Sequence, residues 1–92
     1  MIRSFQSKAL RNFWEKNDER GISPNWVKRV AVILDRLDAA TVPGDMDLPG
    51  LRFHPRKGQQ KGRYQVDLTG AWRITFGWHD NDVIDVDMLE DH

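Results

Sequence analysis

One short stretch of the chain gathers the side chains that could act on a phosphate group. The segment LRFHPRKGQQKGRY, residues 51–64, contains no Asp or Glu. Its basic side chains, counted with its one histidine, are Arg52, His54, Arg56, Lys57, Lys61 and Arg63. Guanidinium and ammonium groups bind phosphate oxygens, and an imidazole titrates near neutral pH, so it can move protons. The stretch therefore predicts a site for a phosphate-bearing ligand, with an exposed, solubilising loop as the alternative.

A further arginine, Arg73, lies in the middle of the alternating run AWRITFGW, residues 71–78. In a strand, this alternation turns Arg73 away from the apolar face. One interpretation is an ordinary surface charge that pairs with Asp67 or Asp85. The other is a guanidinium fixed on a rigid strand, where its fork binds phosphate oxygens at the floor of a site.

The net charge of zero conceals an uneven distribution of charge along the chain. Residues 51–73 carry six basic groups and one acid, whereas residues 74–92 carry six acids and no Lys or Arg. Sign asymmetry of this kind informs about partners more than the total does. The basic middle predicts a phosphate-bearing partner. The acidic end either faces solvent or contributes carboxylates to the site.

The composition is that of one small globular domain, with 92 residues of which 39% are hydrophobic and 30% charged. The absence of cysteine excludes a disulfide framework and a thiolate metal site. There is no P-loop or G-x-G-x-x-G motif, which argues against a nucleotide cofactor, and the three histidines lack metal-ligand spacing. No apolar run approaches the ~20 residues of a membrane span. We therefore expect a cytoplasmic protein that needs no cofactor, metal or membrane.

Helical periodicity predicts the two elements that begin the scaffold. The first spans residues 7–17, with Ser7 as its N-cap and Gly21 as the stop signal beyond it. The second spans residues 23–40, with Ser23 as its cap and a proline at the first helical position. Its apolar stripe consists of Trp26, Val27, Val30, Ile33, Leu34 and Leu37.

Alternating apolar and polar residues predict the strands that must carry the site, at residues 2–5, 51–54, 63–68, 71–78 and 83–89. In the last of these we expect Ile84 on the apolar face, and in the third Tyr64. Helices followed by strands are typical of an α+β fold, with both helices on one face of a mostly antiparallel sheet of about four to five strands. The other face is then open and carries Gln65, Asp67 and Arg73.

In combination, the blocks GLRFHPRKG and WRITF and the final histidine resemble the HigB toxins of type II toxin–antitoxin systems, over nearly the whole chain. The family belongs to the RelE-like fold, so the resemblance implies a single RelE-like domain over residues 1–92. It implies an endonuclease that cleaves messenger RNA on the 70S ribosome through the RNA 2′-hydroxyl, without a metal. It also implies a helix-turn-helix, HigA-like antitoxin, through which alone the protein would reach operator DNA.

Carried over position by position, the resemblance implies a catalytic set of His54, Lys57, Arg73, Glu90, Asp91 and His92. Arg73 and Lys57 would stabilise charge on phosphorus, and His54 or His92 would act as base and acid. Asp91 stands where the family has a tyrosine, and an aspartate neither stacks on a base nor donates a proton at neutral pH. The expected contacts to the RNA backbone are Arg52, Arg56, Lys61 and Arg63.

Three alternatives stay open at the level of the sequence. A ParE-like toxin has the same helix and sheet plan but binds DNA gyrase and cleaves no RNA. A cleavage-deficient homologue would retain only antitoxin binding, which the substitution at Asp91 favours. A plain RNA-binding module would need exposed aromatic platforms, whereas most aromatic residues here occupy predicted core positions.

Overall fold

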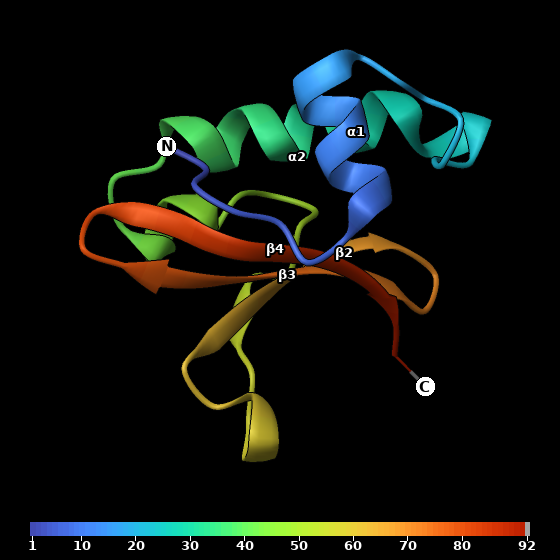
Figure 1. Cartoon of the computed structure of the whole chain (residues 1–92). Coiled ribbons are helices and arrows are strands. Elements are labelled where there is room, and N and C mark those ends of the chain that lie inside the picture. The colour runs from blue at the N-terminus through green and yellow to red at the C-terminus, as the bar shows by residue number, and fades with distance from the viewer. Residues whose placement is uncertain (92) are drawn as a thin grey trace.

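The computed structural model describes residues 1–91. The strands form one antiparallel sheet in the order β1-β2-β3-β4, and Figure 1 shows α1 and α2 together on one of its faces. This arrangement confirms the predicted α+β fold. No helix among these residues is long and apolar enough to cross a membrane. In chain order the elements are α1 (Lys8–Lys16), η1 (Pro24–Trp26), α2 (Val27–Ala39), η2 (Pro43–Met46), β1 (His54–Pro55), η3 (Gly58–Gln60), β2 (Arg63–Thr69), β3 (Trp72–His79) and β4 (Asp82–Glu90).

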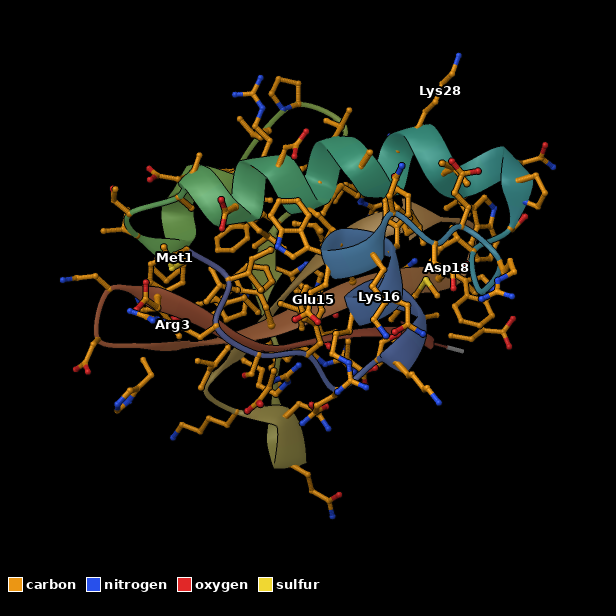
Figure 2. All side chains as sticks on the ribbon, turned by 45° about the horizontal axis from the view of Figure 1, so that its top comes forward. Met1, Arg3, Glu15, Lys16, Asp18 and Lys28 are labelled. Carbon is orange, nitrogen blue, oxygen red and sulfur yellow. The ribbon has the colours of Figure 1, made fainter. Side chains whose placement is uncertain are left out.

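The N-terminal segment runs along β4 and forms two isolated parallel bridges with it, Ile2 to Val83 and Phe5 to Val86. The extended conformation predicted for residues 2–5 is therefore present, although it pairs at two points only. An ion pair fixes the start of this segment, because Arg3 Nε lies 2.7 Å from Asp82 Oδ2. Figure 2 shows Met1 and Arg3 beside the β3–β4 hairpin.

The helix boundaries differ from the prediction at two residues, the glycine expected to stop the first helix and the serine expected to cap the second. Ser7 caps α1 as expected, since its Oγ accepts a hydrogen bond from Leu10 N at 3.2 Å. The helix ends at Asn17, whose φ of 54° is tolerated by an asparagine, so the prediction of Gly21 as the stop signal was wrong. Ser23 also makes no side-chain cap. Its backbone carbonyl instead accepts from Trp26 N at 2.9 Å in the short η1 turn.

The core lies between α2 and the covered face of the sheet. From α2 the buried residues are Val30, Ile33, Leu34 and Leu37, as the predicted stripe requires. The sheet contributes Val66, Leu68, Ile74, Phe76, Val83 and Val86. This layer fixes β2 and β3, and thereby the direction in which each alternate side chain leaves the sheet.

A bulge in β4 reverses the predicted direction of one side chain. The pairs Thr75–Asp87 and Gly77–Ile84 enclose two steps of β3 but three of β4, and Asp85 has a φ of 53°. An extra residue of this kind shifts the alternation by one position. Val83 is therefore buried in the core, and the prediction of Ile84 on the apolar face was wrong. Ile84 lies beside Gly77 on the opposite face.

The edge strand β1 is shorter and later than the predicted strand 51–54. Gly50 and Arg52 both have positive φ, at 84° and 51°, so the chain turns there and becomes extended only at His54. Pro55 is the last residue of β1 and pairs with Tyr64 of β2. A proline is tolerated because β1 is the edge of the sheet. The loop beyond it, with η3, extends away from the sheet on the side opposite the helices (Figure 1).

Candidate active site

The sheet face that the helices leave uncovered carries a row of polar side chains. The register joins His54 to Gln65, Gln65 to Thr75, and Thr75 to Asp87 across four strands. Directly opposed residues project to the same face, so this row crosses the sheet from edge to edge. Gln65 is only 5% exposed and Thr75 is 0% exposed. Side chains from neighbouring positions therefore cover the middle of the row, where Arg56 bonds to Gln65 and Arg63 bonds to Thr75.

A cavity of about 340 Å³ lies at the β1 end of this row. Its lining residues are His54, Pro55, Arg56, Lys57, Gln65 and Asp91. Asp91, directly after β4, is positioned by its backbone N–H, which donates to Ala71 O at 2.7 Å. The cavity thus unites the loop that follows β1 with the end of β4. We call it the β1 cavity.

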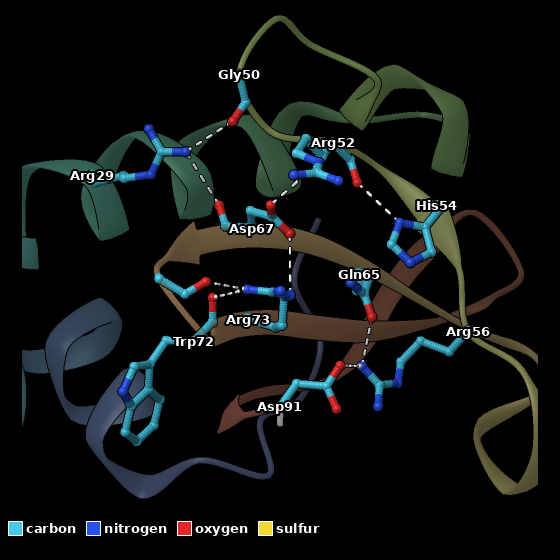
Figure 3. Close-up of polar contacts among 11 residues, drawn as sticks. Arg29, Gly50, Arg52, His54, Arg56, Gln65, Asp67, Trp72, Arg73 and Asp91 are labelled. Carbon is cyan, nitrogen blue, oxygen red and sulfur yellow. Dashed lines mark hydrogen bonds and ion pairs between the residues drawn. The ribbon is translucent and has the colours of Figure 1, made fainter.

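Arg56 is the cation most closely integrated into the β1 cavity (Figure 3). Its backbone N–H donates to Arg63 O at 2.8 Å, which extends the ladder one residue beyond β1. Arg56 lies two residues after His54, so the two side chains share a face. Nη1 donates to Gln65 Oε1 at 2.6 Å and lies 3.7 Å from Asp91 Oδ2. The side chain is only 14% exposed.

His54 has an orientation that suits proton transfer. Its Nδ1 lies 3.1 Å from the backbone carbonyl oxygen of Arg52. A carbonyl oxygen only accepts, so in the neutral ring Nδ1 carries the proton and Nε2 is the basic atom. The ring is exposed at the edge strand, where a ligand can reach Nε2.

Arg73 lies on the predicted face but belongs to a separate cluster. Its Nη1 donates to Gly70 O at 2.7 Å and to Trp72 O at 3.1 Å. Its Nε lies 3.2 Å from Asp67 Oδ1, and Asp67 Oδ2 lies 3.7 Å from Arg52 Nε. We call these three charged residues the Asp67 cluster. Arg73 does not line the β1 cavity, so the expected convergence of Arg73 with His54 and Lys57 in one cavity is not observed.

Arg63 lies flat across the same face, between the row and the β4 bulge. Its Nη2 donates to Thr75 Oγ1 at 3.0 Å and to Asp85 O at 2.7 Å. Burial lowers the pKa of Arg63 and the positive charge of Arg56 lowers it further, while Asp85 and Asp87 act in the opposite direction. The guanidinium stays protonated at neutral pH, because arginine begins from a very high pKa. Its charge therefore adds to the positive potential near Arg56.

The remaining predicted site residues lie around this centre or beyond it. Lys57 lines both the β1 cavity and an adjoining hollow of about 380 Å³, which Lys61 and Arg63 also line. Glu90 pairs in register with Trp72 and is not part of the cavity lining. Tyr64 stacks on Phe76 at a centroid distance of 5.8 Å, which confirms its place on the core side. His92 lies outside the described residues.

The sequence reasoning missed one cavity residue and assigned another to a peripheral role. Gln65 was expected on the open face but not at the site, and Arg56 was expected only as a contact to the RNA backbone. The signal for both was the strand period. His54 and Arg56 are two residues apart, and a β1–β2 hairpin places a β2 side chain against them. In the part of the chain described here, no three His, Asp or Glu side chains form a group that could hold a metal ion.

Comparison with known proteins identifies relatives over most of the chain. A family model described as the RelE-like toxin HigB of type II toxin–antitoxin systems matches residues 3–92. A protein of Proteus vulgaris named endoribonuclease HigB is 33% identical over 82 residues, which is 89% of either chain. The crystal structure of YafQ from Escherichia coli has a TM-score of 0.57 at 17% identity, over 98% of this chain and 91% of that one. A mutant of YafQ gives 0.54 at 15% identity over the same shares. These two structures bear on the fold alone.

Proposed function

This chain belongs to the HigB-like family of RelE-like toxins from type II toxin–antitoxin systems, and on that premise we propose that its β1 cavity cleaves messenger RNA. One observation carries the proposal. A histidine with a basic Nε2 and two cations, Arg56 and Lys57, line a single cavity on the uncovered face of the sheet. The relative from Proteus vulgaris, named an endoribonuclease, supports the same reaction class.

The reaction that this site supports is an intramolecular phosphoryl transfer within RNA. The ribose 2′-oxygen forms a bond to the neighbouring phosphorus as the bond from phosphorus to the 5′-oxygen breaks. The 2′-hydroxyl proton passes to a base, and an acid protonates the departing 5′-oxygen. The products are a 2′,3′-cyclic phosphate and a 5′-hydroxyl. RNA supplies its own nucleophile, so the protein has to provide positioning, proton transfer and charge stabilisation.

We assign the base to His54 through Nε2, since Nδ1 is committed to the Arg52 carbonyl. Lys57 and the arginines of this face stabilise the negative charge that builds up on the phosphate oxygens. We assign the acid to His92, the other histidine of the implied catalytic set, since an aspartate such as Asp91 does not donate a proton at neutral pH. The exposed cations Arg52 and Lys61 hold the RNA backbone on either side.

The proposal includes two partners, the translating ribosome and a helix-turn-helix antitoxin. A site whose histidine is exposed orders its substrate weakly by itself. A ribosome that presents the message in a fixed geometry would supply the missing positioning, which is worth many orders of magnitude in favourable cases. The antitoxin follows from the family, and operator DNA would be reached only through it. Both partners place the activity in the cytoplasm.

The experiment that tests this function maps the 5′ ends of cellular messages shortly after the protein is induced. We expect new 5′ ends inside translated frames, each carrying a hydroxyl, and their loss when translation initiation is blocked. Cuts that persist without translation would overturn ribosome dependence. Intact messages together with DNA damage signalling would instead support a ParE-like, gyrase-binding toxin.

A specific observation favours a second candidate, a homologue that binds its antitoxin but cleaves poorly. Asp91 places a carboxylate 3.7 Å from Arg56, and this negative charge opposes a phosphate in the same cavity. The variant Asp91→Tyr distinguishes the two candidates. A large gain in growth arrest would support the cleavage-deficient homologue, whereas strong arrest by the unmodified protein would exclude it.

A further inference from the structure

The Arg56 side chain is largely buried, yet not all of its N–H groups have a hydrogen-bond acceptor. Only 14% of its side chain is exposed, compared with 83% for Arg52 nearby in the same segment. Nη1 is held by the Gln65 amide, so the guanidinium has a fixed position over the sheet. Nε is shielded from solvent and makes no hydrogen bond within residues 1–91. A buried donor without an acceptor is costly, and an incoming oxygen would remove that cost.

The counter-charge of Arg56 is weakly held. The Nη1 to Asp91 Oδ2 distance of 3.7 Å is longer than a hydrogen bond, and the Asp91 side chain is 43% exposed. A pair at this distance, with one partner exposed to solvent, contributes little free energy. Asp91 therefore offsets the positive charge of Arg56 without accepting a hydrogen bond from it. A phosphate oxygen could replace its carboxylate at small cost.

The Nε of Arg73 is likewise shielded and makes no hydrogen bond within residues 1–91. The rest of the Arg73 guanidinium is held more firmly than that of Arg56, although the resemblance implies that Arg73 is the catalytic arginine. Two backbone carbonyls accept from its Nη1, at 2.7 and 3.1 Å. Its Nε faces the Asp67 carboxylate at 3.2 Å. A phosphate that took these donors would have to break an ion pair whose two side chains are each only 20% exposed.

We propose that Arg56, and not Arg73, is the guanidinium that binds the scissile phosphate in this chain, with Asp91 as the counter-ion that the phosphate displaces. This inference rests on the proposed function and assigns within it the group that stabilises charge. Arg56 keeps its proton throughout and donates to the non-bridging oxygens, while the 2′-oxygen bonds to phosphorus. Arg73 is a positioning residue, which holds the β2–β3 hairpin through Gly70 and Asp67.

The first test observes the arginine Nε–H signals by NMR while inorganic phosphate is added to the full-length protein. We expect the Arg56 signal, assigned by its loss in Arg56→Lys, to shift on saturation, and the Arg73 signal to stay in place. In Asp91→Asn we expect phosphate to bind about two- to fivefold more tightly, in line with the value of an exposed ion pair. A shift at Arg73 alone, or at neither arginine, would overturn the assignment whether or not the protein cleaves RNA.

The second test measures single-turnover cleavage of a defined message on ribosomes. We expect Arg56→Gln to slow cleavage by about 100-fold or more, the scale seen when one charge-stabilising donor is removed. Arg73→Gln should slow it less than tenfold once protein with native thermal stability is compared. Arg20→Gln is the matched control, because Arg20 is exposed and pairs with Asp18 between the helices.

A sulfur substitution distinguishes phosphate binding from a merely structural role of Arg56. Sulfur in place of one non-bridging oxygen weakens a guanidinium hydrogen bond, so the wild-type enzyme should discriminate between the two phosphorothioate diastereomers. That discrimination should collapse in Arg56→Gln and persist in Arg73→Gln. If it collapses in Arg73→Gln and persists in Arg56→Gln, the inference is wrong, whereas absence of wild-type cleavage contradicts the proposed function and leaves the NMR test to decide the inference.

Discussion

Two arginine sites lie on one face of the same sheet, yet their electrostatic states differ (Figure 3). In the Asp67 cluster, Arg73 has a carboxylate at 3.2 Å and two carbonyl acceptors. In the β1 cavity, Arg56 has one strong acceptor, the Gln65 amide, and a carboxylate at 3.7 Å. Both guanidinium groups are mostly shielded from solvent. The Nε of each arginine makes no hydrogen bond within residues 1–91, so the two sites differ in how closely the counter-charge is held and in how many acceptors bind Nη1.

The difference follows from where each arginine sits in the sheet. Arg73 is on the inner strand β3, directly opposite Asp67 of β2, so the register itself supplies its counter-charge. Arg56 lies beyond the two-residue edge strand β1, where no partner strand continues on its outer side. Its counter-charge has to come from the end of β4. An arginine with a close counter-charge in a strand centre stabilises the fold, whereas an arginine with a distant counter-charge at an edge can bind an anion.

The largest expected effect comes from the apolar layer that supports both sites. Phe76 is fully buried on the covered face of the sheet, on the same strand as Arg73 and directly opposite Tyr64 of β2. The substitution Phe76→Ala should destabilise the protein by about 3–5 kcal/mol, because it removes a large core side chain and leaves a cavity. Urea unfolding followed by tryptophan fluorescence would measure this, with the exposed Val32→Ala as control. If Phe76→Ala disturbed the structure of only one of the two sites, the view that one apolar layer supports both sites would be contradicted.

A smaller effect should distinguish the two sites directly. Asp67→Asn leaves the shielded guanidinium of Arg73 without its counter-charge, so we expect a loss of about 2 kcal/mol. The matched change Asp91→Asn removes an exposed, distant carboxylate and should alter stability by less than about 0.5 kcal/mol. Chemical denaturation of both variants checks the pair. Equal losses would contradict the distinction between a closely held and a weakly held counter-charge.

The sequence predicted the face of each site but not its state of charge compensation. Alternation in residues 63–68 and 71–78 correctly placed Gln65, Asp67 and Arg73 together, because strand geometry leaves only two directions. It also offered Asp67 as the partner of Arg73. The choice between that pair and a phosphate depended on distances of a few tenths of an ångström, which no periodicity encodes.

Two features of the backbone were beyond prediction for a related reason. The β4 bulge at Asp85 depends on a single positive φ, and an aspartate in a strand gives no signal strong enough to predict it. The late start of β1 depends on Arg52, which also has a positive φ. An arginine is not a residue type from which a positive φ can be predicted. These two irregularities decide which side chains face the site, so the fold was more predictable than the cavity.

An intermediate effect should come from the buried acceptor of Arg63, the second arginine near the β1 cavity. Thr75 is 0% exposed, and its Oγ1 accepts from Arg63 Nη2 at 3.0 Å. Thr75→Val keeps the shape but removes the acceptor, while Asp85 O continues to hold the guanidinium. We expect a loss of about 1 kcal/mol in thermal or chemical unfolding. Thr69→Val at the exposed end of β2 is the control, and an equal loss there would contradict a specific role of the Thr75 hydroxyl.

The smallest expected effect concerns an ion pair remote from both sites, between Arg3 and Asp82 (Figure 2). The hydrogen bond from Arg3 lowers the pKa of Asp82 below its ordinary value of 3.8, and the N-terminal ammonium group acts in the same direction. A carboxyl group whose pKa is lower in the folded state stabilises the fold above its unfolded pKa and loses that contribution as the pH falls through the folded value. The stability difference between wild type and Asp82→Asn should therefore be constant from about pH 5 to 7 and shrink below 3.8. Asp80→Asn, at an exposed turn position, should show no such dependence on pH. If the Asp82→Asn difference grows on acidification, this ion pair does not contribute to stability in the way that the lowered pKa requires.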